Sequence, residues 1–130
     1  MKLRNKEFFD ILKMKIIKLK DPKKIEALKI TENFSAKEFA CNHCKEVVIE
    51  EQLVYQLQQL RDIFNTGIII TSGYRCPTHN ARVGGSKQSL HIKGKAADFT
   101  MLGEINAFQV FTEACKIFNR VGLYQSSNNP

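Results

Sequence analysis

Apolar residues along the chain follow periods that predict both helices and short strands. A helix is expected at residues 49–65, because four apolar side chains there recur at spacings of four, three and four and so share one face. These are Leu53, Leu57, Leu60 and Phe64. Residues 68–71 form a β-branched run that indicates a buried strand, and residues 96–100 predict a second one. The mixture favours a small α+β domain in which an antiparallel β-sheet carries helices packed on one face.

A second core helix is expected at residues 104–120, where apolar side chains again fall on one face. The side chains expected to be buried are Phe108, Phe111, Cys115 and Phe118. Upstream, Ser35 and Glu38 have the spacing of a capping box at the start of a short turn. A third strand is expected to begin at residues 122–124.

The first 24 residues differ in character from the rest. Their apolar side chains fall on one helical stripe with lysines opposite, so we predict an N-terminal amphipathic helix. The stripe consists of Phe8, Phe9, Leu12, Ile16 and Leu19. Asp21-Pro22 is expected to end this helix, because proline cannot continue it. The predicted organisation is a basic helix at residues 1–24 followed by one domain at residues 25–130.

Charge is distributed unevenly over these two parts. The 130 residues carry a net charge of +7, but residues 1–24 alone hold nine Lys or Arg and three acidic residues. The remainder is nearly neutral, so we expect no phosphate-binding groove and no nucleic-acid partner. Lysines interrupt the apolar stripe, so neither a signal peptide nor a membrane span is expected. The helix is expected to pack on the domain or a partner, or to attach to an anionic membrane surface.

Residues of the types that catalyse reactions or bind metals gather in a segment at residues 72–95 that is rich in Gly, Ser, Asn, His and Arg. Long irregular segments inside compact domains are frequently functional. His91 and Asp98 lie seven residues apart across Gly94, so a tight return over the glycine would bring imidazole and carboxylate together. Catalytic zinc takes three protein ligands of such types and leaves one position for water. This pair would supply two of the three.

A longer motif surrounds the pair. It consists of Ser72-Gly73-Tyr74-Arg75, Asn80, Gly84-Gly85, Ser89, His91 and Asp98. The motif resembles the zinc D-alanyl-D-alanine carboxypeptidase family of peptidoglycan metallopeptidases, which includes phage endolysins and shares its fold with hedgehog domains. The resemblance implies that His91 and Asp98 bind Zn²⁺. It further implies that Arg75 holds or polarises the substrate's carbonyl or carboxylate, and that Ser89 lines the substrate site.

The resemblance is incomplete at the C-terminal side. Members of that family take a third zinc ligand from a histidine on a strand after the final helix, with an acidic general base near it. This sequence has no histidine after His91 and no acid after Glu113. Three interpretations stay open: a truncated or processed form of a longer enzyme, a site completed by another residue or chain, or a domain that keeps the fold without hydrolysis. Without the missing ligand and base, the site would bind zinc weakly and activate water poorly.

The cysteines indicate a second, independent site. Cys41-x-x-Cys44 and Cys76-x-x-His79 are two ligand pairs with spacings that could close a structural zinc site. Free thiols and a disulfide are the alternatives. His43 is expected to be a solvated loop residue, and Cys115 a buried small apolar side chain.

Two functions are compatible with these features. The first is a zinc-dependent D,D-carboxypeptidase or endopeptidase that acts on peptidoglycan stem peptides or other D-Ala-containing peptides, in the bacterial cytoplasm or delivered to the cell wall by a phage. The alternative is a catalytically inactive peptidase-fold binding or structural module, such as a virion component, attached through the N-terminal helix. The cleaved bond and the oligomeric state are not readable from the sequence.

Overall fold

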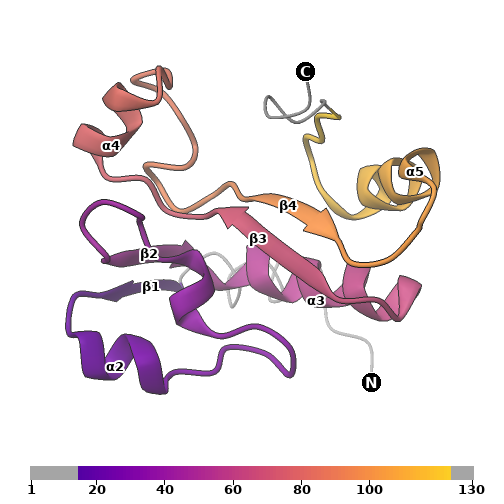
Figure 1. Ribbon diagram of the computed structural model, residues 1–130, viewed down its shortest axis with the longest axis horizontal. Helices are drawn as coiled ribbons and strands as arrows, with labels where there is room; N and C mark the ends of the chain where they lie inside the picture. The colour runs from indigo at the N-terminus through magenta and orange to yellow at the C-terminus, as the bar shows by residue number, and fades with distance from the viewer. Residues whose placement is uncertain (1–14, 124–130) are drawn as a thin grey trace.

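A computed structural model of the chain describes residues 15–123 (Figure 1). Its elements are, in order, β1 (Ile16–Leu19), α2 (Pro22–Ala27), the 3₁₀ turn η1 (Ala36–Phe39), β2 (Val47–Glu50), α3 (Glu51–Phe64), β3 (Ile68–Ser72), α4 (Pro77–Arg82), β4 (Asp98–Met101) and α5 (Ala107–Ile117). The predicted α+β class is confirmed. Within the described residues the strands form two separate antiparallel pairs, β1 with β2 and β3 with β4, instead of one central sheet.

The N-terminal helix prediction is wrong for residues 16–19. They form strand β1, in which Ile17 pairs with Ile49 and Leu19 with Val47. Ile17 and Leu19 alternate with Lys18 and Lys20, which also fits a half-buried strand, and the available β2 edge decides between the two periods. Asp21-Pro22 begins α2 instead of ending a helix, because the Asp21 side chain accepts a hydrogen bond from the Lys23 backbone N–H. Residues 1–14 of the predicted helix lie outside the described residues.

One apolar core joins β2, α3, β3 and α5. The predicted periodicity of α3 is confirmed, and the helix buries Leu53, Val54, Leu57 and Leu60. Phe34 and Phe39 pack beside them with ring centroids 6.1 Å apart. The predicted capping box is also confirmed, since the Glu38 side chain accepts hydrogen bonds from the Ser35 backbone N–H and hydroxyl.

Helix α5 presents a different face from the predicted one. Phe108 is 73% exposed and Cys115 is exposed as well, so the prediction that both are buried is wrong. The side chains that face the core are Val110, Ala114 and Ile117. Apolar residues occur on more than one side of this helix, and its contact with α3 selects the side that is buried. The strand expected from residue 122 is not formed at Gly122 or Leu123, and Tyr124 lies outside the described residues.

The predicted strands at residues 68–71 and 96–100 exist as β3 and β4 and pair with each other. Their ladder has an irregularity between Ile70 and Ser72, beyond which Ser72 pairs with Asp98. The segment expected to be irregular contains one short helix, α4, which begins with Pro77 after Cys76. No helix in the described part of the chain is long and apolar enough to cross a membrane.

Candidate active site

Strands β3 and β4 position the two predicted zinc ligands from opposite sides. Asp98 is the first residue of β4, and Gly73 directly follows β3. His91 arrives on the loop between α4 and β4, and its backbone carbonyl accepts a hydrogen bond from the Arg75 backbone N–H at 3.2 Å. The end of the β3–β4 pair therefore fixes both the carboxylate and the histidine loop.

A hydrogen bond from Nδ1 orients the imidazole of His91, so that Nε2 faces Asp98. Nδ1 lies 2.8 Å from the Gly73 carbonyl oxygen, which can only accept, so Nδ1 carries the proton. Nε2 then has a free lone pair and lies 3.6 Å from Asp98 Oδ2. The His91 side chain is 11% exposed and the Asp98 side chain 32%. The structure thus brings the predicted pair together, with one edge open to solvent.

Gly94 makes this return of the chain possible. Its φ of +73° lies in the left-handed region, and a Cβ at this position would clash with the Val48 carbonyl oxygen. Its own carbonyl accepts a hydrogen bond from the Glu50 backbone N–H at 2.8 Å. The tight turn predicted at Gly94 is formed, and the glycine also lets the His91 loop lie directly against β2.

Arg75 and Ser89 lie beside His91. The Ser89 hydroxyl accepts hydrogen bonds from Arg75 Nη2 at 3.2 Å and from the His91 backbone N–H at 3.3 Å. Arg75 Nε is buried and has no hydrogen-bond partner among the described residues. All four predicted site residues are therefore neighbours, and Arg75 is held by its contact with Ser89.

Asn80 and Ser86 shape the loop that carries Ser89. Asn80 is 3% exposed, and its Nδ2 donates to the Ser86 carbonyl at 2.8 Å. The Gly85 backbone N–H donates to the Asn80 carbonyl, and the Ser89 backbone N–H to the Ser86 carbonyl. The sequence motif included Asn80 without a role, and the structure gives it a structural one.

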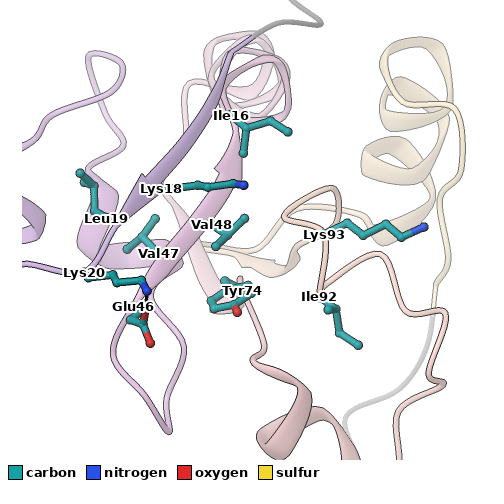
Figure 2. A pocket seen from close by; sticks show the side chains of 10 residues that line it. All are labelled: Ile16, Lys18, Leu19, Lys20, Glu46, Val47, Val48, Tyr74, Ile92 and Lys93. Carbon is teal, nitrogen blue, oxygen red and sulfur yellow. Dashed lines mark ion pairs between the residues drawn. The ribbon is translucent and has the colours of Figure 1, made fainter.

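A pocket of about 480 Å³ is lined by residues of β1 and β2 and by residues next to the predicted site (Figure 2). Its lining includes Tyr74 and Ile92, the chain neighbours of Arg75 and His91. Lys18, Lys20 and Lys93 line it as well, and Lys20 pairs with Glu46 at 3.8 Å. Sequence reasoning missed this pocket, because part of its wall comes from the strand that was predicted to be a helix.

A second group of ligand-type side chains does not include His91. The sulfur atoms of Cys41, Cys44 and Cys76 all lie within 4.8 Å of one another. Burial raises the pKa of Cys41, but hydrogen bonds from nearby backbone N–H groups outweigh it and bring that pKa down to about 7. Burial raises the pKa of Cys44 to about 11. None of the four cysteines forms a disulfide, and the predicted fourth ligand, His79, is not in this group.

Comparison with known families identifies the relatives of this domain. Residues 25–129 match the family described as Peptidase M15. The chain belongs to the peptidase M15 family. The match includes His91, Asp98 and the cysteine group but begins after β1. The chain matches no curated protein and no solved structure.

Membership in the M15 family confirms the predicted relationship to zinc D-Ala-D-Ala peptidases, and the donor set at His91 can be tested against zinc. Two tetrahedral ligands, an imidazole nitrogen and a carboxylate oxygen, lie about 3.4 Å apart when each is about 2.0–2.1 Å from the ion. The His91 Nε2 to Asp98 Oδ2 distance of 3.6 Å is close to that value. The other imidazole nitrogen, Nδ1, donates a hydrogen bond to the Gly73 carbonyl, as is typical of histidines that bind zinc. The residues present therefore fit the metal.

Proposed function

We propose that this M15 family member is a zinc-dependent D,D-carboxypeptidase or endopeptidase that acts on peptidoglycan stem peptides. The observation that carries the proposal is the facing pair of His91 Nε2 and Asp98 Oδ2, with His91 Nδ1 already bonded to the Gly73 carbonyl. A histidine held in this way presents one lone pair in one direction, which suits a metal ligand better than a surface ion pair.

Each neighbouring side chain has a role in this proposal. Zinc bound by His91 and Asp98 would supply Lewis-acid polarisation of the scissile carbonyl and acidification of water. Arg75 presents a planar fork of donors suited to a peptide carboxylate or to the charge that develops on the carbonyl oxygen. Ser89 accepts from Arg75 Nη2 and so orients that fork toward the substrate. The lysines around the Figure 2 pocket would attract the acidic side chains of a stem peptide.

The proposal requires a third ligand and a general base. Among the described residues no third His, Cys, Asp or Glu joins His91 and Asp98. The ligand would therefore come from elsewhere in the protein or from a partner. This requirement also gives the second candidate function its support: a non-catalytic module of the same fold, for example in a phage particle, that binds wall peptides through Arg75 and the lysine-lined pocket.

Release of D-alanine from peptides that end in D-Ala-D-Ala, and of new amino groups from purified peptidoglycan, tests the enzymatic proposal. We expect zinc-dependent turnover that His91→Ala and Asp98→Asn abolish. His79→Ala is the matched histidine control, because the His79 side chain is in neither ligand group. Absence of turnover on both substrates, together with binding of the same peptides, would instead support the non-catalytic module.

A further inference from the structure

The cysteine group is built from two loops that are distant in sequence. Cys41 and Cys44 lie between η1 and β2, and Cys76 lies directly before α4. The first loop is a tight turn in which the Lys45 backbone N–H donates to the Cys41 carbonyl at 2.9 Å. The Cys41 backbone N–H in turn donates to the Glu46 carbonyl at 2.8 Å. Both sulfurs of this turn therefore face the same side, toward Cys76.

Backbone N–H groups point at the sulfur atoms. The Cys76 N–H lies 3.4 Å from Cys41 Sγ, and the His79 N–H lies 3.4 Å from Cys76 Sγ. Such contacts stabilise negative charge on sulfur, and deprotonation of all three cysteines would require a positive partner. Cys41 and Cys76 are both buried, which keeps the bulk solvent from supplying it.

His43 is exposed and lies at the edge of the group, where its ring contacts one of the three sulfurs. His43 Nδ1 lies 3.4 Å from Cys76 Sγ. In a tetrahedral zinc site with Zn–S of about 2.3 Å and Zn–N of about 2.0 Å, a nitrogen and a sulfur ligand lie about 3.5 Å apart. We propose that Cys41, Cys44, Cys76 and His43 bind a structural zinc ion, separate from the peptidase site.

The ligand chemistry selects both the metal and the type of site. Three thiolates and one imidazole are the ligands of structural zinc, and soft thiolates disfavour magnesium and calcium. Four protein ligands leave no position for a substrate. A disulfide between two of the cysteines would leave the third sulfur without a partner inside the group.

The proposed ion would hold two distant segments of the chain together. It joins the turn before β2 to the residue that follows Arg75, so the segment from Gly73 to Cys76 is held at both ends: His91 donates to Gly73, and the metal binds Cys76. The Tyr74 backbone N–H also donates to the Phe39 carbonyl at 2.9 Å. Because the ligands converge only in the folded chain, zinc binding stabilises the fold.

Metal analysis and Co²⁺ spectroscopy test this site without relying on activity. The starting protein is His91→Ala/Asp98→Asn, which removes the other proposed ligands. We expect one zinc per chain that survives dialysis. After exchange with Co²⁺ we expect thiolate-to-cobalt charge-transfer bands and the intense visible bands of tetrahedral cobalt. Absence of bound zinc, or cobalt spectra without thiolate bands, would overturn the proposal.

Single variants in the same background then assign the ligands. Cys44→Ser and His43→Ala are each expected to weaken zinc binding at least tenfold, as measured by competition with a chromogenic chelator. Cys115→Ser and His79→Ala are the matched controls and should bind as tightly as the parent. Loss of binding in His79→Ala with none in His43→Ala would refute the role of His43. If a serine variant does not fold, the spectrum of the Co²⁺ form of the parent still decides whether thiolates bind the metal.

Discussion

The two ligand groups of this chain differ in how completely the described residues enclose them. At His91 and Asp98, two donor atoms face each other 3.6 Å apart and the carboxylate side chain is one-third exposed. At the cysteine group, three sulfurs converge, the ring of His43 lies beside one of them, and two of the cysteines are buried. Catalytic zinc sites keep a position open, whereas structural ones are closed by four protein ligands. The openness of each group therefore matches the role proposed for it.

The same short segment connects the two groups. Gly73 orients His91, Arg75 donates to the Ser89 hydroxyl, and Cys76 belongs to the cysteine group. The ligands are separate, but the backbone that positions them is shared. Substitutions in the cysteine group, the closed group, should therefore also affect the position of His91 in the open group. Substitutions of His91 or Asp98 should leave the cysteine group unchanged.

The largest expected effect is a loss of activity on substitution of His91, with no loss of zinc from the cysteine group. His91→Ala should lower kcat/KM by about 10³-fold or more, because one of the few ligands of the open site is lost. The same variant should retain the zinc bound by the cysteines, measured as one zinc per chain after dialysis. Loss of both metals in His91→Ala would show that the two groups are not independent.

Removal of metal from the closed group should lower thermal stability. A ligand present at about 1,000 times its Kd stabilises the folded state by about 4 kcal/mol. For a domain of this size, we therefore expect strong chelation to lower Tm by on the order of 10 °C. Differential scanning calorimetry of the wild type and of His91→Ala measures it. An equal Tm with and without chelator in both proteins would contradict a structural role for the ion.

Arg75→Lys tests the shared segment at the open site. Lysine keeps the positive charge but loses the planar fork that bonds Ser89. We expect kcat/KM to fall by about 10–100-fold, with the zinc content unchanged. Steady-state kinetics on a D-Ala-D-Ala peptide provide the measurement, and an unchanged kcat/KM would remove Arg75 from the substrate site.

The smallest effect concerns the loop that carries His91. Gly94→Ala combines a left-handed backbone with a clash against Val48, whereas Gly84→Ala has a similar φ of +74° in open space. We expect Gly94→Ala to lower the free energy of unfolding by about 2–4 kcal/mol and Gly84→Ala by about 1 kcal/mol. Urea unfolding of both variants measures the difference. Equal losses would mean that the clash with β2 is relieved without displacement of the loop.

Several features could be read from the sequence because short-range spacing determines them. The four-three-four spacing in α3, the Ser35 and Glu38 capping box and the β-branched strand β3 are all formed as predicted. His91 and Asp98 were brought together as expected, since a glycine turn between them needs only local conformational freedom. These features depend on residues within one or two turns of each other.

Other features depended on contacts between distant segments. Ile16–Leu19 fits a helix or a strand equally well, and only pairing with β2, about 30 residues away, makes it a strand. The face of α5 that is buried was decided by its contact with α3. His43 is exposed in a loop, as expected, but it also lies near Cys76, because two segments 33 residues apart in sequence converge.

The sequence by itself determined which chemical groups are present and how several short segments fold, because backbone preferences and side-chain periods act over a few residues. Only the tertiary structure decided which groups meet. The contact of His43 with Cys76, and β1 as a wall of the lysine-lined pocket, result from long-range packing, whose contacts no local spacing encodes.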